Sequence, residues 1–371
     1  MIQTALRTDI FLMSLELGKN KWLLTFGNGQ RIRKRQINAR DLSALDREIA
    51  AARARLNTQA PLQSCYEAGR DGFWLHRALT LRRITNLVMD PSSIEVNRRQ
   101  RRRKSDCVDG EALLRLLGRY VAGERGHVSI LRVPNETVED QRRPQRELAR
   151  LTKERTQHTN RIKSLLALHG VELKSLTKLS NTLDQVRDWN GEPLRSHVAA
   201  EIGRDLERIE LLDRQIKTVR QEQDERVKQA PNDQQNRKIE SLRNLRGIDR
   251  AAFVLAFEFF GWRTFSNPRE VGAAAGLVGT PYQSGDRMRE QGISKAGSAR
   301  IRSLMVELAW SWVRYQPGSK LTQWFVERFS AGGSRSRRVG IVALARKLLV
   351  ALWRFLEQGA IPEGAEMKLA G

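Results

Sequence analysis

Residues 98–110 join a basic tract to two carboxylates, and together they could bind a phosphate through a metal ion. Six of the seven residues 98–104 are Arg or Lys, and Asp106 and Asp109 follow directly. A basic tract attracts phosphates, whereas carboxylates repel them unless a cation lies between. If the chain after Lys104 is helical, the two aspartates lie about one turn apart on one face. Two neighbouring oxygen ligands are what divalent-metal phosphoryl chemistry requires. A solvated face or a basic arm is the simpler alternative.

Two further carboxylates stand where a sheet could present them to the same site. Glu16 lies within the apolar run 10–17, and Glu67 ends the short run 62–67 before Ala68 and Gly69. A carboxylate buried in a strand needs a partner or a metal, although alternation would equally place Glu16 on a wet face. Functional residues of α/β sheets gather at strand ends, which favours Glu67. An ordinary exposed strand-end glutamate remains the alternative.

The segment 272–297 carries the candidate nucleophiles. It is rich in glycine and contains Ser284 and Ser294, with basic residues around it. We expect irregular chain here, because glycine allows backbone to approach a ligand closely. A serine near arginines could attack a phosphodiester while the arginines stabilise the developing charge. Taken alone this signal is weak, because most loop serines have no chemical role.

Composition indicates a polyanionic partner. The chain of 371 residues has 66 Lys and Arg against 42 Asp and Glu, a formal net charge of +24. Such an excess favours nucleic acid over other partners. We find no apolar run long enough to span a membrane and no signal peptide pattern. Two cysteines without a CxxC pair indicate no zinc site and a reducing compartment. We therefore expect a soluble protein that is cytoplasmic or nucleoid-associated.

The elements that must position these residues are predicted to form three domains. In the first, residues 10–17 and 22–26 read as a β-hairpin, 41–56 as a helix with Asp41 as N-cap, and 62–67 and 84–89 as strands around a helix in 72–81. A helix is expected from Asp106 to about residue 121. This order predicts an α/β layer.

The second and third domains are predicted to be helical. Residues 135–169 and 195–229 are long, charged and nearly free of glycine, and they predict an antiparallel coiled-coil hairpin around a turn at 190–193. Residues 230–236 read as a linker. Residues 242–260 resemble a helix-hairpin-helix, with a plain packing unit as the alternative. The tryptophans near the C-terminus read as core residues, and 332–338 as a basic loop before a helix at 339–356. The predicted domains are 1–133, 134–236 and 237–371.

The ordered set of segments resembles the DEDD transposases of the insertion sequence 110 family. The resemblance rests on Glu16, on CYEAG around Glu67, on KSDCVDGEAL around Asp106 and Asp109, and on the block GLVGTPYQSG…GISKAGSARIR. The last two segments resemble the family patterns Lys-Thr-Asp-x-x-Asp-Ala and Gly-Leu-x-Pro-x-x-x-x-Ser-Gly…Lys-x-Gly. The resemblance spans nearly the whole chain.

This resemblance implies a RuvC-like domain of RNase H fold whose acidic quartet, Glu16, Glu67, Asp106 and Asp109, binds Mg²⁺, with Mn²⁺ as a substitute. It implies a C-terminal transposase domain in which Ser284 becomes joined to a DNA end. It also implies donor and target DNA, a noncoding bridge RNA as guide, and a homo-oligomer, dimer to tetramer, with composite sites. The residues predicted to contact nucleic acid are Arg98, Arg99, Arg101, Arg102, Arg103, Lys104, Arg287, Arg289, Lys295 and Arg300.

Two departures from the family pattern affect these assignments. Glu16 stands where the family usually has aspartate, which moves the carboxylate one methylene further out. Gly279 stands where proline is common, and Pro281 follows, so the loop around Ser284 could be shifted by a residue or two. Two other functions stay open: a metal-dependent, structure-selective nuclease such as a junction resolvase, and a nucleic-acid-binding coiled-coil protein without catalysis.

Overall fold

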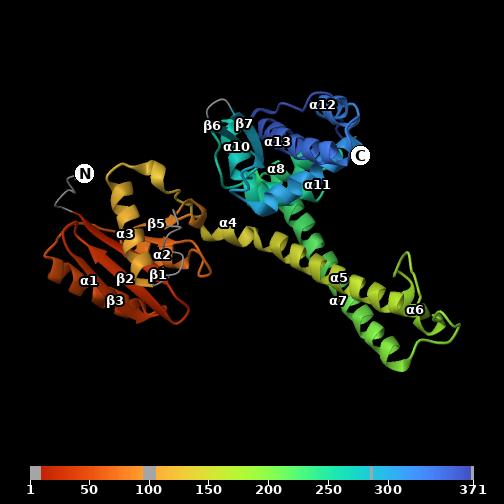
Figure 1. The fold of residues 1–371 in the computed structure, drawn as a ribbon, viewed down its shortest axis with the longest axis horizontal. Coiled ribbons are helices and arrows are strands. Elements are labelled where there is room, and N and C mark those ends of the chain that lie inside the picture. Colours follow the sequence, from red (N-terminus) through yellow and green to blue (C-terminus); the bar gives the residue numbers. More distant parts are fainter. Residues whose placement is uncertain (1–9, 95–105, 285–286, 369–371) are drawn as a thin grey trace. The chain divides into compact units, whose positions relative to one another are not determined.

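The computed structural model describes residues 10–94, 106–284 and 287–368, and the side chains of 92, 106–109 and 281–291 lie outside that description. The chain divides into two compact units, Met1–Pro134 and Asn135–Gly371. Figure 1 labels helices and strands of both units. The described residues contain no helix long and apolar enough to cross a membrane.

The first unit is built on a five-stranded sheet of order β3-β2-β1-β4-β5. Strands β1, β2 and β3 pair antiparallel, whereas β4 and β5 run parallel to β1. The predicted hairpin, strands and helices are confirmed. The elements are β1 (Phe11–Leu17), β2 (Lys21–Gly27), β3 (Ile32–Asn38), α1 (Leu42–Leu56), β4 (Leu62–Glu67), α2 (Trp74–Leu81), β5 (Thr85–Met89) and α3 (Asp106–Val121).

Helices cover both faces of this sheet, because its central strands are apolar on both sides. Residues such as Phe11, Leu15 and Trp22 pack with α1 and α2 on one face. Leu12 and Cys65 pack with α3 on the other. Helix α1 begins where the sequence predicts, since the Asp41 side chain accepts a hydrogen bond from the Ala44 amide at 2.8 Å.

The second unit begins with a long helical hairpin, as predicted. Helix α4 (Glu136–Gln141) leads into α5 (Arg143–Leu168), which packs antiparallel to α7 (Ser196–Gln229). Leu151 meets Ile216 near one end, and Ile162 meets Ile202 near the other. The connection is more than a turn, because it contains α6 (Leu179–Thr182) and buries Leu179 and Leu194.

The rest of this unit is mainly helical around one apolar core (Figure 1). Its elements are α8 (Gln234–Arg243), α9 (Ala251–Val254), the π-helical turn η5 (Leu255–Phe260), α10 (Pro268–Ala274), β6 (Gly279–Ser284), β7 (Arg287–Ile293), α11 (Ala299–Tyr315), α12 (Lys320–Phe329) and α13 (Ser334–Gln358).

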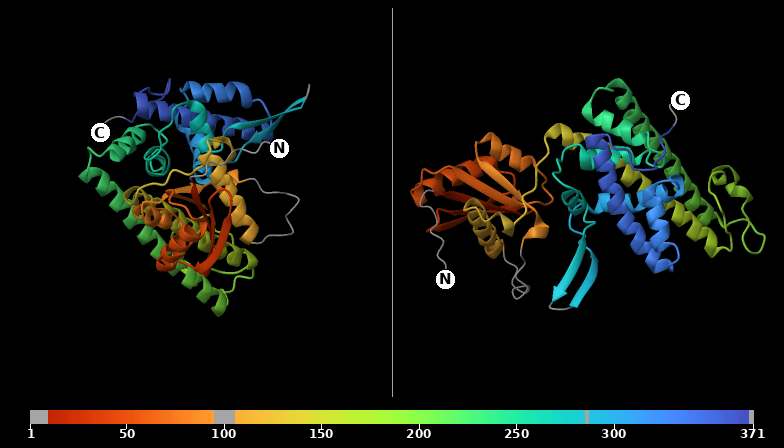
Figure 2. Two further views of the ribbon diagram at one scale, coloured as in Figure 1. Left: turned by 90° about the vertical axis from the view of Figure 1, so that its left-hand side faces the viewer. Right: turned by 90° about the horizontal axis from the view of Figure 1, so that it is seen from above.

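Four sequence expectations are wrong here. The linker 230–236 already contains the start of α8, which Asp233 caps. The segment 272–297 is not irregular, because β6 and β7 form an antiparallel hairpin that extends from the helices (Figure 2). The loop 332–338 is largely the first turn of α13. Trp312, Phe325 and Trp353 are buried as expected, but Trp310 is 44% exposed.

The 242–260 segment has the contacts expected of a packing unit. Leu242, Leu245 and Ile248 are buried in the core. The Gly247 carbonyl accepts a hydrogen bond from the Ser311 hydroxyl at 2.8 Å, and the Arg246 amide donates to the Glu366 carbonyl. Because these turn groups have internal partners, the structure favours packing over phosphate binding at this turn.

Candidate functional site

Strands β1 and β4 carry two of the predicted acidic residues on one face of the sheet. The strands are parallel neighbours, and Leu15 lies opposite Tyr66. Glu16 and Glu67 each follow by one residue, so they point away from the face that Leu15 and Tyr66 occupy. Glu16 is half-buried and Glu67 is exposed.

Helix α3 begins over that same face. The Ser14 hydroxyl donates a 2.6 Å hydrogen bond to the Gly110 carbonyl, and the Cys65 thiol lies 3.6 Å from the Leu113 carbonyl. Ser14 and Cys65 each precede their glutamate by two residues and therefore share its face. Further along, Gly118 approaches Leu12, so α3 runs antiparallel to β1 and its first turn lies toward Glu16.

The backbone thus brings the four predicted acidic positions to one end of one sheet face. Asp106 and Asp109 occupy the first turn of α3, three residues apart, although their side chains lie outside the described part of the structure. Among the side chains that are described, no group of three or more His, Cys, Asp or Glu forms a metal site. The placement fits a divalent cation, because carboxylate oxygens are its preferred ligands.

A cation on the edge strand β3 fixes the second turn of α3. Lys34 of β3 pairs with Glu111 at 2.5 Å, and this hydrogen bond lowers the pKa of the Glu111 carboxyl. Burial raises the pKa of the Cys65 thiol above its usual range, which keeps it protonated beneath α3.

Ser284 is the last residue of β6 and lies opposite Arg287 at the end of the β6–β7 hairpin. The intervening residues 285 and 286, and the side chains of Ser284, Arg287 and Arg289, lie outside the described part of the chain. The serine position therefore stands at the tip of a two-stranded ribbon, where the sequence predicts irregular chain. Ser294 is exposed beyond β7, and its amide donates to the Val278 carbonyl at 2.8 Å.

Two glycines of the segment 272–297 lie at the base of this ribbon. Gly276 and Gly297 have φ of 67° and 95°, the left-handed region that favours glycine. A Cβ at Gly297 would lie 2.5 Å from the Ala274 carbonyl oxygen. Arg302 donates to the Lys295 carbonyl at 3.0 Å. These residues support the base of the ribbon. In the sequence, the glycines of this segment were the signal that its backbone has a special role.

The predicted nucleic-acid contacts fall into three groups. The six residues Arg98, Arg99, Arg101, Arg102, Arg103 and Lys104 lie outside the described residues, as do the side chains of Arg287 and Arg289. Lys295 is exposed. Arg300 is used inside its unit, because it pairs with Glu258 at 3.3 Å and donates to the Gln145 carbonyl at 2.5 Å.

Sequence reasoning missed the buried polar cluster around Glu258. This residue is 6% exposed and belongs to the π-helical turn η5. Burial raises its carboxyl pKa, and Arg300, Arg146 and Arg142 partly oppose that shift. Burial also lowers the pKa of Arg263 to about 10. No periodicity signals such a cluster, since its members come from segments far apart in the chain.

Comparison with known proteins places this chain among transposases. A model of the family described as "Transposase IS116/IS110/IS902 family" matches residues 240–323. "Putative transposase y4rJ" of Sinorhizobium fredii is 42% identical over 98% of this chain and 97% of its own length. The "Transposase for insertion sequence element IS1328" of Yersinia enterocolitica is 25% identical over 57% of this chain and 61% of its own length. The similarity to the putative transposase y4rJ covers both chains almost completely. The chain therefore belongs to the IS116/IS110/IS902 family of transposases.

Proposed function

We propose that this chain is the transposase of an insertion sequence and that it cuts and rejoins DNA through a covalent bond to Ser284. The observation that carries the proposal is the placement of Glu16, Glu67 and the first turn of α3 at one end of a sheet face, in a chain of this family. The serine position at the tip of the β6–β7 ribbon supports it, because a ribbon tip can reach a DNA backbone.

The covalent step conserves the phosphodiester's bond energy. The Ser284 hydroxyl loses its proton and attacks phosphorus, the Ser Oγ–P bond forms, and one strand P–O bond breaks to release a hydroxyl. A hydroxyl of another strand then attacks the phosphoserine, and the serine oxygen leaves. Because one P–O bond replaces another at each step, strands are exchanged without an external energy source.

The acidic positions are suited to hold Mg²⁺ or Mn²⁺ at this reaction. Glu16, Glu67, Asp106 and Asp109 would supply the ligands, and the bound ion would neutralise charge on the scissile phosphate. Glu16 can serve in place of aspartate, since it stands on the face that α3 covers. An RNase H-like fold for the first unit is supported by the strand order β3-β2-β1-β4-β5, with helices on both faces.

We further infer a noncoding RNA guide and a homo-oligomer. The net charge of +24 supports extensive nucleic-acid contact. The resemblance implies composite sites in which the acidic positions and the serine come from different copies. The α5–α7 hairpin offers a long surface on which copies could associate. The bacterial cytoplasm, where the DNA lies, is the expected compartment.

A denaturing gel tests the covalent step. Full-length protein is incubated with Mg²⁺, the element's DNA and its flanking noncoding RNA, and we expect a DNA-linked protein band that Ser284→Ala eliminates. Ser294→Ala is the matched control, since that serine is exposed just beyond the same ribbon, and it should keep the band. Strand cleavage that survives Ser284→Ala but not Asp106→Asn would instead support the metal-dependent nuclease.

A further inference from the structure

A surface cavity of about 410 Å³ lies between α11 and the start of α13, within the second unit. Trp310 of α11 lines the cavity. So do Gly332 and Gly333, in the loop before α13, and Arg337 and Arg338 of α13. None of its lining residues is acidic. The volume lies in the range of pockets that hold small organic groups. The sequence predicts a basic segment at 332–338, and the proposed serine reaction assigns no role to that segment.

The Trp310 ring is exposed yet held in place. Its side chain is 44% exposed, whereas Trp312 on the same helix is 1% exposed. Trp310 packs edge-on against Phe325 of α12, with ring centroids 6.2 Å apart and planes at 81°. A rigid aromatic ring that is open to solvent is a surface on which a flat group can stack.

The two arginines have no partner in the part of the chain that the structure describes. The side chains of Arg337 and Arg338 are exposed, and their guanidinium groups take part in no ion pair or hydrogen bond there. Arg300 and Arg250, by contrast, are paired with carboxylates at 3.3 and 2.5 Å. A Cβ added to Gly333 would meet nothing within 4 Å, so the loop leaves space beside these guanidinium groups. Guanidinium groups in such a position suit phosphate.

We infer that this cavity binds one nucleotide of a nucleic-acid strand whose base is unpaired. The base stacks on Trp310, and the phosphates on either side contact Arg337 and Arg338. A paired base in a duplex keeps its faces stacked on its neighbours, so the cavity selects single-stranded segments. DNA and RNA share this chemistry. The inference rests on the proposed function only in requiring that the chain acts on nucleic acid.

Fluorescence anisotropy with full-length protein and a ten-thymidine strand, dT10, tests this assignment. Trp310→Ala should weaken binding of dT10 by about 5-fold to 150-fold, the effect of losing one base–aromatic stack. It should not change binding of an abasic sugar–phosphate strand of the same length and charge, or of a ten-base-pair duplex. Arg337→Ala with Arg338→Ala should weaken dT10 and the abasic strand alike. A ten-uridine strand, run in parallel, shows whether RNA, DNA or both occupy the cavity.

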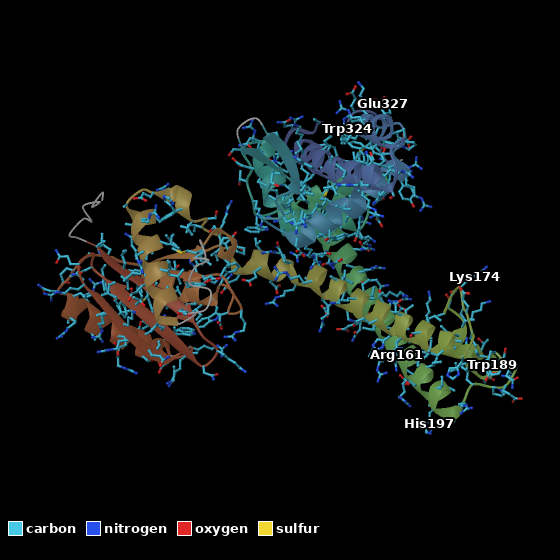
Figure 3. All side chains as sticks on the ribbon, in the orientation of Figure 1. Arg161, Lys174, Trp189, His197, Trp324 and Glu327 are labelled. Carbon is cyan, nitrogen blue, oxygen red and sulfur yellow. The ribbon has the colours of Figure 1, made fainter. Side chains whose placement is uncertain are left out.

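Two substitutions serve as controls. Trp310→Phe keeps an aromatic ring against Phe325 and should retain most of the affinity. Trp189, labelled in Figure 3, is 77% exposed at the end of the α5–α7 hairpin, and Trp189→Ala should have no effect. The inference would be overturned if Trp310→Ala weakened binding of dT10, the abasic strand and the duplex equally. It would also be overturned if Trp310→Ala weakened binding of neither dT10 nor the ten-uridine strand. The two proposals can fail separately. If Ser284→Ala kept the covalent band while Trp310→Ala still weakened the binding of dT10, the proposed serine reaction would be wrong and nucleotide binding in the cavity would be supported.

Discussion

Gly110 sets how closely α3 approaches the sheet. A Cβ at this position would lie 2.7 Å from the Thr25 hydroxyl oxygen, closer than real Cβ contacts allow. Its carbonyl also accepts the buried hydrogen bond from Ser14. The residue that follows Asp109 therefore lets the first turn of α3 lie directly over β1 and β2, where the acidic positions meet.

Gly110→Ala should lower the free energy of unfolding by about 1–3 kcal/mol, the usual cost of overpacking. It should also reduce metal-dependent strand cleavage, because α3 must move away from Glu16 and Glu67. Urea unfolding and a cleavage assay measure the two effects.

A second glycine of the same helix provides the control. A Cβ at Gly118 would meet only Leu12, at 3.5 Å, which is ordinary contact. Gly118→Ala should stabilise the chain by about 0.5–1 kcal/mol through helix propensity. Thr25→Ala should restore cleavage to the Gly110→Ala variant. Equal stability of Gly110→Ala and the parent chain would show that α3 is not held this closely.

Among the elements, the π-helical turn η5 joins the base of the hairpin to the C-terminal core. Its Glu258 lies within reach of Arg300, and the Arg142 guanidinium lies 5.0 Å from the centre of the Trp262 ring. The Arg300 bond to the Gln145 carbonyl fixes the start of α5 in the same cluster. Irregular helical turns often mark places where a fold serves a function beyond packing.

The pH dependence of stability tests this cluster. Burial raises the pKa of Glu258, so the folded state holds its proton more tightly than the unfolded state. Its contribution is therefore full below the unfolded pKa of about 4.3 and is lost as pH rises through the folded value. Between pH 4.5 and 7.5, the free energy of unfolding of the parent chain should fall relative to that of Glu258→Gln.

Glu357→Gln is the control for that experiment, because this residue is exposed and its one ion pair among the described residues is with Lys238, at 3.5 Å. Its difference from the parent chain should change little across the same range. A Glu258→Gln difference that is constant with pH would mean that the carboxyl is not perturbed in the folded state.

Elements with strong local patterns were predictable from the sequence, and those defined by partners were not. The runs around Glu16 and Glu67 and the cap at Asp41 predict β1, β4 and α1 closely. Strand β3 was missed because three of its seven residues are consecutive cations, and its pairing to β2 comes from the backbone. The β6–β7 ribbon was missed because glycines hide strand alternation.

The sequence singled out the candidate residues of the site but not the contacts that surround them. The family resemblance implied that Glu16 and Glu67 share one site, and the structure places them on neighbouring parallel strands. The approach of α3 depends on Ser14 and Gly110, residues 96 positions apart in the chain. Contacts of this kind leave no local periodicity, so only the folded structure reveals them.

For the whole molecule, the net charge of +24 predicts a strong salt dependence of nucleic-acid binding. Each phosphate contact to a single strand contributes about 0.7 to the slope of log affinity against log salt. Arg337→Ala with Arg338→Ala should therefore reduce the slope for dT10 by about 1.4. Arg204→Ala, at an exposed residue on α7, should leave the slope unchanged. An unaltered slope in the double variant would show that these arginines contact no phosphate.

Strand β3 has a consequence for how copies of the chain coexist. It is the outer strand of the sheet and carries Arg33, Lys34 and Arg35 in succession. Arg33 and Arg35 pair with Glu48 of α1, and Lys34 pairs with Glu111 of α3. An open sheet edge invites aggregation by strand addition, and charged side chains along the edge strand oppose that addition. The side chains that fasten β3 to its helices therefore also protect this edge of the sheet from the addition of another strand.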